Sequence, residues 1–322
     1  MKPRQWLVLA MIALLVPAVA ACGTAGAPAA PTSKPSGAAT SPTNAPASGG
    51  SGSVVRIGSK NFTEQLILGE MYAQLLEANG IKVQRKLNLG GTIVAHDALK
   101  NGDIDLYPEY TGTALLAILN EPTQSDPEKV YQEVAKQYKQ QFNLVWLDQS
   151  PMNDTQALAV TKKLSDEKHL TTISQMVAMA SQLVLAAVPD FPDRADGLVG
   201  LKKVYGDFNF KQIKIFDPGI KYQALLNGQA DVVVAFGTDG PINGYNMVLL
   251  KDDKGLWPPY HVAPVVRQDA LDKNPNIKVL NKLAPSLTTE VMQQLNWKVD
   301  GPDKADPATV AHDFLKSKAL VS

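Results

Sequence analysis

The chain has 322 residues, of which 45% are hydrophobic and 19% are charged, enough to bury the cores of two ordinary domains. Its 31 basic residues balance its 31 acidic ones, and the part after residue 21 is slightly acidic because Lys2 and Arg4 precede it. Nucleic-acid-binding proteins usually carry a basic excess, so we predict no nucleic-acid partner. The single cysteine excludes an intramolecular disulfide and a cysteine-based metal site.

The first 21 residues have the features of an export signal. Lys2 and Arg4 supply positive charge, residues 6–16 are almost wholly apolar, and small residues precede Cys22. This arrangement resembles a bacterial lipoprotein signal, whose cysteine is lipidated and becomes the mature N-terminus. We therefore predict a signal peptide over 1–21 and an extracytoplasmic protein that is anchored to the cell membrane through a lipid on Cys22. The alternative is a plain secretory signal cut at the preceding alanines. The apolar core is shorter than the ~20 residues that a spanning helix needs.

Residues 22–53 are predicted to form a disordered tether. After Cys22 they are almost entirely Ala, Pro, Ser, Gly and Thr, a composition that cannot bury a core. A flexible chain of this length typically spans about 30 Å.

The folded part begins at Val54 with alternating strands and helices. We predict strands at 54–59, 82–89 and 103–107 and helices at 63–78 and 92–100. Pro108 is expected to end the third strand, and the apolar residues 114–119 to form the next helix. This alternation implies a largely parallel sheet with helices on its faces.

A second unit of similar size follows. The first unit ends with a predicted helix at 126–142 and a strand at 144–147. The second unit is predicted to contain strands at 157–160, 183–188, 213–216 and 231–236 and helices at 173–180, 198–205 and 222–227. A strand at 261–266 and helices at 275–284, 289–295 and 307–318 complete the chain. Two α/β units and a C-terminal segment that can return to the first suggest a hinged cleft.

Tyr110 stands where the third strand meets a helix start. Ligands bind at such places in open α/β sheets, although a tyrosine there can also simply pack a domain edge. Asp103, Asp105 and Glu109 come close in sequence without a partner nucleophile, so we interpret them as structural. The four histidines show no metal-ligand spacing. We predict no metal site, no cofactor and no enzymatic activity.

Five segments resemble one family, the substrate-binding proteins of ABC importers for osmoprotectants such as glycine betaine, choline and carnitine. They are Ile57-Gly58-Ser59-Lys60-Asn61-Phe62-Thr63-Glu64-Gln65, Glu109-Tyr110-Thr111-Gly112-Thr113, Asn153-Asp154-Thr155, Ala235-Phe236-Gly237-Thr238-Asp239-Gly240 and Pro258-Pro259-Tyr260. The resemblance covers residues 54–318, in order and at similar spacing. It implies an α/β fold of the two-lobe, type II periplasmic-binding-protein (Venus-flytrap) class, with a ligand cleft between the lobes.

The resemblance also implies an organisation and a function. Residues 54–153 and 261–322 would form lobe 1, and residues 154–260 would form lobe 2. The protein would be an extracytoplasmic monomer that captures a quaternary-ammonium or zwitterionic solute and delivers it to an ABC permease with its ATPase.

A quaternary ammonium group has no N–H to donate, so aromatic faces recognise it, at roughly 0.5–2 kcal/mol each. By the resemblance, Tyr110, Phe236 and Tyr260 fall on positions of the family's aromatic cage, whereas Gln156 stands where many members have a tyrosine. Either another aromatic residue, such as Phe62 or Tyr222, compensates for this wall, or the pocket accepts a head group that needs a hydrogen bond.

The opposite end of the ligand, a carboxylate, needs cations and hydrogen-bond donors. By the resemblance, Lys60, Thr113 and Arg194 contact this carboxylate, and Asp154 contributes through its backbone. Keeping both Lys60 and Arg194 favours a carboxylated betaine over choline, unless Arg194 is simply a surface arginine. The alternatives are a binding protein for a different polar or cationic solute, a sensor that acts through another chain, and a secreted enzyme on the same fold.

Overall fold

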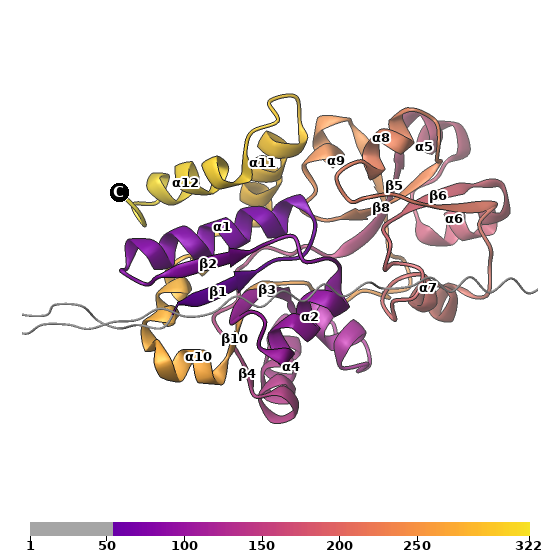
Figure 1. Cartoon of the computed structure of the whole chain (residues 1–322). Coiled ribbons are helices and arrows are strands. Elements are labelled where there is room, and N and C mark those ends of the chain that lie inside the picture. The colour runs from indigo at the N-terminus through magenta and orange to yellow at the C-terminus, as the bar shows by residue number, and fades with distance from the viewer. Residues whose placement is uncertain (1–53) are drawn as a thin grey trace, which may run out of the picture. The chain divides into compact units, whose positions relative to one another are not determined.

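The structure is a computed structural model that describes residues 54–322 (Figure 1). The predicted signal peptide, the lipidation site Cys22 and the tether lie outside the described residues. Across residues 54–322, no helix combines the length and the apolar character needed to cross a bilayer.

The first sheet has five strands in the order β2-β1-β3-β10-β4. Their bounds are Val55–Gly58 (β1), Val83–Lys86 (β2), Leu106–Tyr110 (β3), Leu144–Trp146 (β4) and Val262–Arg267 (β10). β1 runs parallel to β2 and β3, whereas β10 runs antiparallel to β3 and β4.

The second sheet repeats this plan with the order β7-β6-β8-β5-β9. Its strands are Gln156–Thr161 (β5), Val184–Ala187 (β6), Gln212–Ile215 (β7), Val232–Phe236 (β8) and Met247–Leu250 (β9). Here β5 runs antiparallel to β8 and β9, while β6 is parallel to β7 and β8. The sheets are therefore mixed rather than largely parallel. The chain passes from the first sheet to the second before β5 and returns to the first before β10. Neither strand is therefore joined to its neighbour by the right-handed crossover connection that makes neighbouring strands parallel.

Helices cover both faces of each sheet. Their bounds are Thr63–Ala78 (α1), Thr92–Asn101 (α2), Thr111–Thr113 (α3), Pro127–Phe142 (α4), Lys162–Lys168 (α5), Ile173–Ala178 (α6), Leu198–Tyr205 (α7), Lys221–Leu226 (α8), Gly240–Gly244 (α9), Gln268–Lys273 (α10), Thr289–Asp300 (α11) and Pro307–Ser317 (α12). Residues Ala114–Ile118 form a π-helical turn (η1), and Ala180–Gln182 (η2), Pro275–Lys282 (η3) and Ala284–Ser286 (η4) are 3₁₀-helical. The predictions missed α5, α9, α10 and β9, and the segment expected as a helix at 275–284 is 3₁₀-helical instead.

The two cores of the second sheet follow from side-chain alternation along β5. Leu158 and Val160 are buried against one set of helices that includes α6 and α7, whereas Ala157 and Ala159 are buried with Tyr222 of α8 on the other face. The first sheet is likewise covered by α1, α11 and α12 on one side and by α2 and α4 on the other (Figure 1). The central strands of both sheets are thus buried on both faces, whereas the edge strands β2 and β7 are half-buried or exposed.

Pro108 does not end its strand, contrary to the prediction. β3 continues through Pro108 to Tyr110, and Pro108 is the register partner of Pro264 in β10. The two carbonyls point away from the shared ladder, since that of Pro264 accepts from Leu147 N and that of Pro108 accepts from Gln65 Nε2. In a strand the N–H and C=O of one residue point to the same side, so neither missing N–H is needed between the two strands.

Candidate functional site

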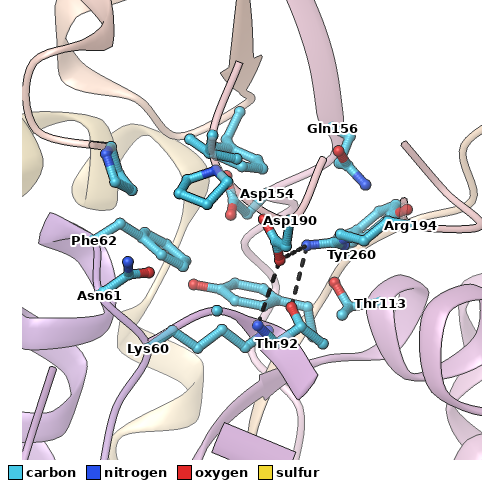
Figure 2. A pocket seen from close by; sticks show the side chains of 16 residues that line it. Lys60, Asn61, Phe62, Thr92, Thr113, Asp154, Gln156, Asp190, Arg194 and Tyr260 are labelled. Atoms are coloured by element: carbon cyan, nitrogen blue, oxygen red, sulfur yellow. Dashed lines mark hydrogen bonds and ion pairs between the residues drawn. The ribbon is translucent and has the colours of Figure 1, made fainter. Parts of the chain in front are cut away.

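One pocket is lined by all of the predicted ligand-binding residues (Figure 2). These residues are Lys60, Tyr110, Thr113, Asp154, Gln156, Arg194, Phe236 and Tyr260. The space between atoms in this pocket is about 620 Å³, which includes open solvent at its mouth. The pocket is also lined by Phe62, Thr92 and Asp190. The sequence indicated Phe62 only as an alternative aromatic wall and did not predict the other two.

The pocket residues lie at strand ends. Lys60 follows the carboxyl end of β1, Tyr110 ends β3 and Phe236 ends β8. Gln156 begins β5, but β5 is antiparallel to β8 and pairs Gln156 with Phe236, so both lie at the same edge of the second sheet. The edges of both sheets at which ligands commonly bind therefore contribute to one pocket.

Tyr260 can reach the pocket only because position 112 is glycine. A Cβ atom at Gly112 would lie 2.6 Å from both Cδ2 and Cε2 of Tyr260, closer than such atoms approach. The ring therefore packs directly on the backbone that begins α3, beside the predicted donor Thr113.

The aromatic side of the pocket contains a stack of rings. Phe62 stacks on Tyr110 and on Phe236, with ring centroids 6.3 and 5.7 Å apart. Lys221 Nζ also lies 4.2 Å from the ring centre of Phe236. Phe62 thus brings a further aromatic ring to the pocket, and its compensation for Gln156 stays a prediction. Tyr222 does not line the pocket, and its hydroxyl donates to Asp239 Oδ2 at 2.5 Å.

The two tyrosines predicted to form the aromatic cage are held by their hydroxyl groups. Tyr110 donates to Glu64 Oε1 at 2.7 Å, and Tyr260 donates to Asp196 Oδ2 at 3.0 Å. Burial raises the pKa of both hydroxyls well above the ordinary value for tyrosine, so each remains a donor at neutral pH. Gln156 Nε2 likewise donates to the Asp196 carbonyl at 3.1 Å, and Gln156 lines the pocket.

Lys60 and Arg194 line the pocket, but neither is the free cation that the sequence argument assumed. Lys60 Nζ is 2.6 Å from Glu109 Oε1, and the two side chains are 4% and 0% exposed. Burial lowers the pKa of Lys60, and the adjacent Glu109 opposes this shift. Arg194 donates from Nε and Nη2 to the two carboxylate oxygens of Asp196, at 2.7 Å each. The positive charge at this end of the pocket is therefore already balanced.

The third guanidinium nitrogen of Arg194, Nη1, links the segment beside the second sheet to helix α2, which covers the first sheet. Arg194 Nη1 donates to Thr92 Oγ1 at 3.1 Å and lies 3.4 Å from Asp190 Oδ2. The same Asp190 oxygen is 3.5 Å from the backbone nitrogen of Thr92, at the start of α2 (Figure 2). Burial alone would lower the pKa of Arg194, but the neighbouring aspartates raise it above its ordinary value, so it stays charged.

Asp154 meets its surroundings differently from the prediction. Its backbone N–H donates to the Tyr260 carbonyl at 3.0 Å and is therefore committed within the protein. Its carboxylate Oδ1 accepts from the backbone N–H and the hydroxyl of Thr238, at 3.2 and 2.5 Å. The side chain, rather than the backbone N–H, is thus the distinctive group that Asp154 brings to the pocket.

Two of the three carboxylates that the sequence suggested as structural are engaged in the fold, whereas Asp103 is exposed. Asp105 forms an ion pair with Arg56, and Glu109 binds Lys60 and the hydroxyl of Tyr107. Within residues 54–322, no group of three or more His, Cys, Asp or Glu side chains is arranged to hold a metal ion.

Comparison with known proteins identifies the family. Residues 53–317 match the model of the substrate-binding domain of ABC-type glycine betaine transport systems. The chain belongs to this family. Its members are transport binding proteins without a catalytic step, which removes the enzyme alternative. The chain is an extracytoplasmic solute-binding protein for the import of quaternary-ammonium compatible solutes, with the predicted type II α/β fold.

Individual relatives agree with this assignment. A carnitine transport binding protein of Listeria monocytogenes is 37% identical over 272 residues, covering 83% of this chain and 88% of that protein. An ergothioneine transport permease/ergothioneine binding protein of Helicobacter pylori is 34% identical over 82% of this chain and 47% of its own length. The crystal structure of a glycine betaine/carnitine/choline ABC transporter protein superposes with a TM-score of 0.65 at 34% identity, covering 83% of this chain and 99% of that one.

Proposed function

We propose that the pocket binds a carboxylated betaine, such as glycine betaine or carnitine. The observation that carries this proposal is the meeting of Tyr110 and Tyr260 with Lys60 and Arg194 in one pocket. Aromatic faces suit the trimethylammonium group, and Arg194 Nη1 with the Thr113 hydroxyl suits the carboxylate.

We also propose how the bound solute is delivered. The chain would divide into lobe 1 (54–153 and 261–322) and lobe 2 (154–260), with the contacts of Arg194 and Asp190 to Thr92 joining the two. Closure around the ligand would populate the conformation that docks on the permease and its ATPase. The protein would act as a monomer.

Calorimetric titration with glycine betaine, carnitine and choline in one buffer tests the ligand assignment. We expect tight binding of the two carboxylated ligands and weaker binding of choline, which lacks the carboxylate. Equal binding of all three would contradict a role for Lys60 and Arg194 in selection. No binding of any of them would contradict the assignment as a whole.

Asp190 is expected to compete with a ligand carboxylate, because its Oδ2 lies beside Arg194 Nη1 and Thr92 N. The variant Asp190→Asn should therefore bind glycine betaine more tightly, by about tenfold (~1.4 kcal/mol), with little change for choline. Parallel titrations of the two ligands check this difference. Asp193→Asn, an exposed position in the same segment, is the control and should match the unaltered protein. A similar gain for choline, or none for glycine betaine, would refute the competition.

A second candidate ligand is ergothioneine, a trimethylammonium betaine that also carries a polar imidazole-thione ring. Gln156 favours it, because this amide lines the pocket where an aromatic wall was expected and can bond with a polar ring. Competition between ergothioneine and glycine betaine decides between them. If the Gln156→Tyr variant no longer binds ergothioneine but still binds glycine betaine, the Gln156 amide contacts the imidazole-thione ring. If both ligands respond equally, it does not.

We propose finally that a lipid on Cys22 anchors the protein to the membrane through the tether 22–53. Support comes from the signal-like residues before Cys22 and from the extracytoplasmic role of the family. The variant Cys22→Ser should then leave the membrane fraction when cells are fractionated, and retention in that fraction would contradict the anchor.

A further inference from the structure

Two buried carboxylates lie beside the aromatic side of the pocket. Glu64, near the start of α1, is 2% exposed, and Asp154, which lines the pocket, is 3% exposed. Figure 2 shows Asp154 between the side chains of Phe62 and Tyr260. Glu64 is joined to the pocket through the hydroxyl of Tyr110.

The groups that donate hydrogen bonds to these two carboxylates are neutral. Glu64 accepts from Tyr110 OH at 2.7 Å and from Asn296 Nδ2 at 3.0 Å, and Asp154 accepts from Thr238. Asn296 also donates to the Thr238 carbonyl at 2.9 Å, so one amide connects the surroundings of the two carboxylates. Its own Oδ1 is buried without a hydrogen-bond partner.

The surrounding elements add more negative than positive charge. Asp239 follows β8 and is paired at 3.0 Å with Lys221 of α8, and Asp300 of α11 accepts from the Thr63 hydroxyl. The remaining titratable neighbours, Tyr72 of α1 and Tyr222 of α8, are neutral at physiological pH because burial raises the pKa of both. Lys60, at the end of β1, is held by Glu109. Among the ion pairs of residues 54–322, none includes Glu64 or Asp154.

A buried carboxylate without a counter-ion is unfavourable, and two close together are more so. Burial raises the pKa of Glu64 to about 7 and raises the pKa of Asp154 well above its ordinary value. The charge of Glu64 adds to the shift in the pKa of Asp154, and the charge of Asp239 adds to the shifts of both. Because the two groups interact, the proton belongs to the pair rather than to one residue.

We propose that Glu64 and Asp154 together form the counter-ion site for the cationic head group, and that the head group expels a proton from this pair when it binds. The inference rests on the proposed function, because it requires a quaternary-ammonium ligand. No bond forms in this step except that between the released proton and a water or buffer molecule. The ligand's fixed positive charge replaces the proton as the partner of the carboxylates.

The direction of the pH dependence follows from this exchange. The bound cation lowers the pKa of the pair, so binding releases a proton when the pH lies below the raised value of about 7 and above the lowered one. Affinity therefore rises with pH up to about 7 and is flat above it. For one released proton the rise approaches tenfold per pH unit.

Titration of the purified protein with glycine betaine from about pH 5.5 to pH 8 tests the proposal, because the ligand's carboxyl group stays ionised over this range. Calorimetry in two buffers of different ionisation enthalpy counts the released protons. We expect affinity to rise roughly tenfold or more across the range, with up to one proton released per ligand near the acidic end. Binding with no proton release and no dependence on pH would overturn the inference while leaving the proposed function intact.

Two isosteric variants test whether Glu64 and Asp154 cause the pH dependence of the affinity. Glu64→Gln imitates the protonated state, so it should match the unaltered protein near pH 5.5, bind more weakly at pH 8 and lose most of the pH dependence. Asp154→Asn should act in the same direction, because the two carboxylates share the proton. Glu70→Gln changes a carboxylate of the same helix that pairs with Arg85 outside this pocket, and it should keep the pH dependence. A full pH dependence in both Glu64→Gln and Asp154→Asn would overturn the proposal.

A measurement on the ligand-free protein separates this proposal from ligand identity. Infrared difference spectra between acidic and neutral pH should contain the C=O band of a buried protonated carboxyl group, and Glu64→Gln or Asp154→Asn should weaken it. If the band is present but none of the quaternary-ammonium ligands binds, the proposed function fails and the counter-ion role fails with it. Absence of the band would contradict the proton-sharing pair directly, even if glycine betaine binds.

Discussion

Replacing Lys60 by methionine is expected to lower the free energy of unfolding by about 3–5 kcal/mol. The substitution would leave Glu109, which is fully buried, without the ammonium group that lies 2.6 Å from its Oε1. The remaining partners of Glu109, the Tyr107 hydroxyl and the Tyr110 N–H, are neutral. Denaturant unfolding measures the loss.

A double variant distinguishes the cost of the unpaired Glu109 carboxylate from the cost of lost packing around Lys60. Combining Lys60→Met with Glu109→Gln removes both charges and should restore much of the stability, since the cost arises from one unpaired buried charge. Lys162→Met is the matched control, because it breaks an ion pair with Asp166 whose side chains are 53% and 61% exposed, and it should cost less than about 1 kcal/mol. A Lys60→Met loss as small as that of Lys162→Met would contradict the buried pair.

Replacing Tyr260 by alanine is expected to remove measurable ligand binding and to destabilise the fold by about 3–5 kcal/mol. Tyr260 is 1% exposed, belongs to the core of the first sheet, lines the pocket and packs on Gly112. Its removal deletes one aromatic face and leaves Asp196 with one donor fewer. Calorimetric titration and denaturant unfolding measure the two losses.

Two further variants divide the effect of Tyr260→Ala. Tyr260→Phe keeps the ring but not the hydroxyl, so glycine betaine should still bind within about tenfold of the original affinity. Tyr138→Ala removes an equally buried ring that lies outside the pocket, so it should destabilise the fold without changing affinity. If Tyr138→Ala weakens binding as much as Tyr260→Ala does, the loss reflects stability and not the cage.

Some features of the site could be predicted from the sequence because they depend on local patterns. The apolar periodicity and terminal Asn79-Gly80 locate helix 63–78, which matches α1 at both ends. Tyr110 lies at a strand-to-helix junction, as predicted, although the strand extends past Pro108 because the second proline, Pro264, also faces away from the shared ladder. The resemblance to a known family placed eight residues that line one pocket.

Other features depend on which strands are neighbours and could not be predicted in this way. Lys60 and Glu109 are 49 residues apart and meet only because β1 and β3 pair in the first sheet, so the sequence argument counted Lys60 as a free cation. Glu64 and Asn296 are 232 residues apart, and no local pattern marks them as partners. The stacking of Phe62 on Phe236 similarly requires both sheets to meet at the pocket.

A crystal structure of the protein with glycine betaine bound would show directly how the ligand lies in the pocket. We expect the quaternary nitrogen within about 6 Å of the ring centres of Tyr110 and Tyr260, with Asp154 beside it, and the ligand carboxylate at Arg194 and Thr113. A ligand bound with its carboxylate toward the tyrosines, or bound outside this pocket, would contradict the account.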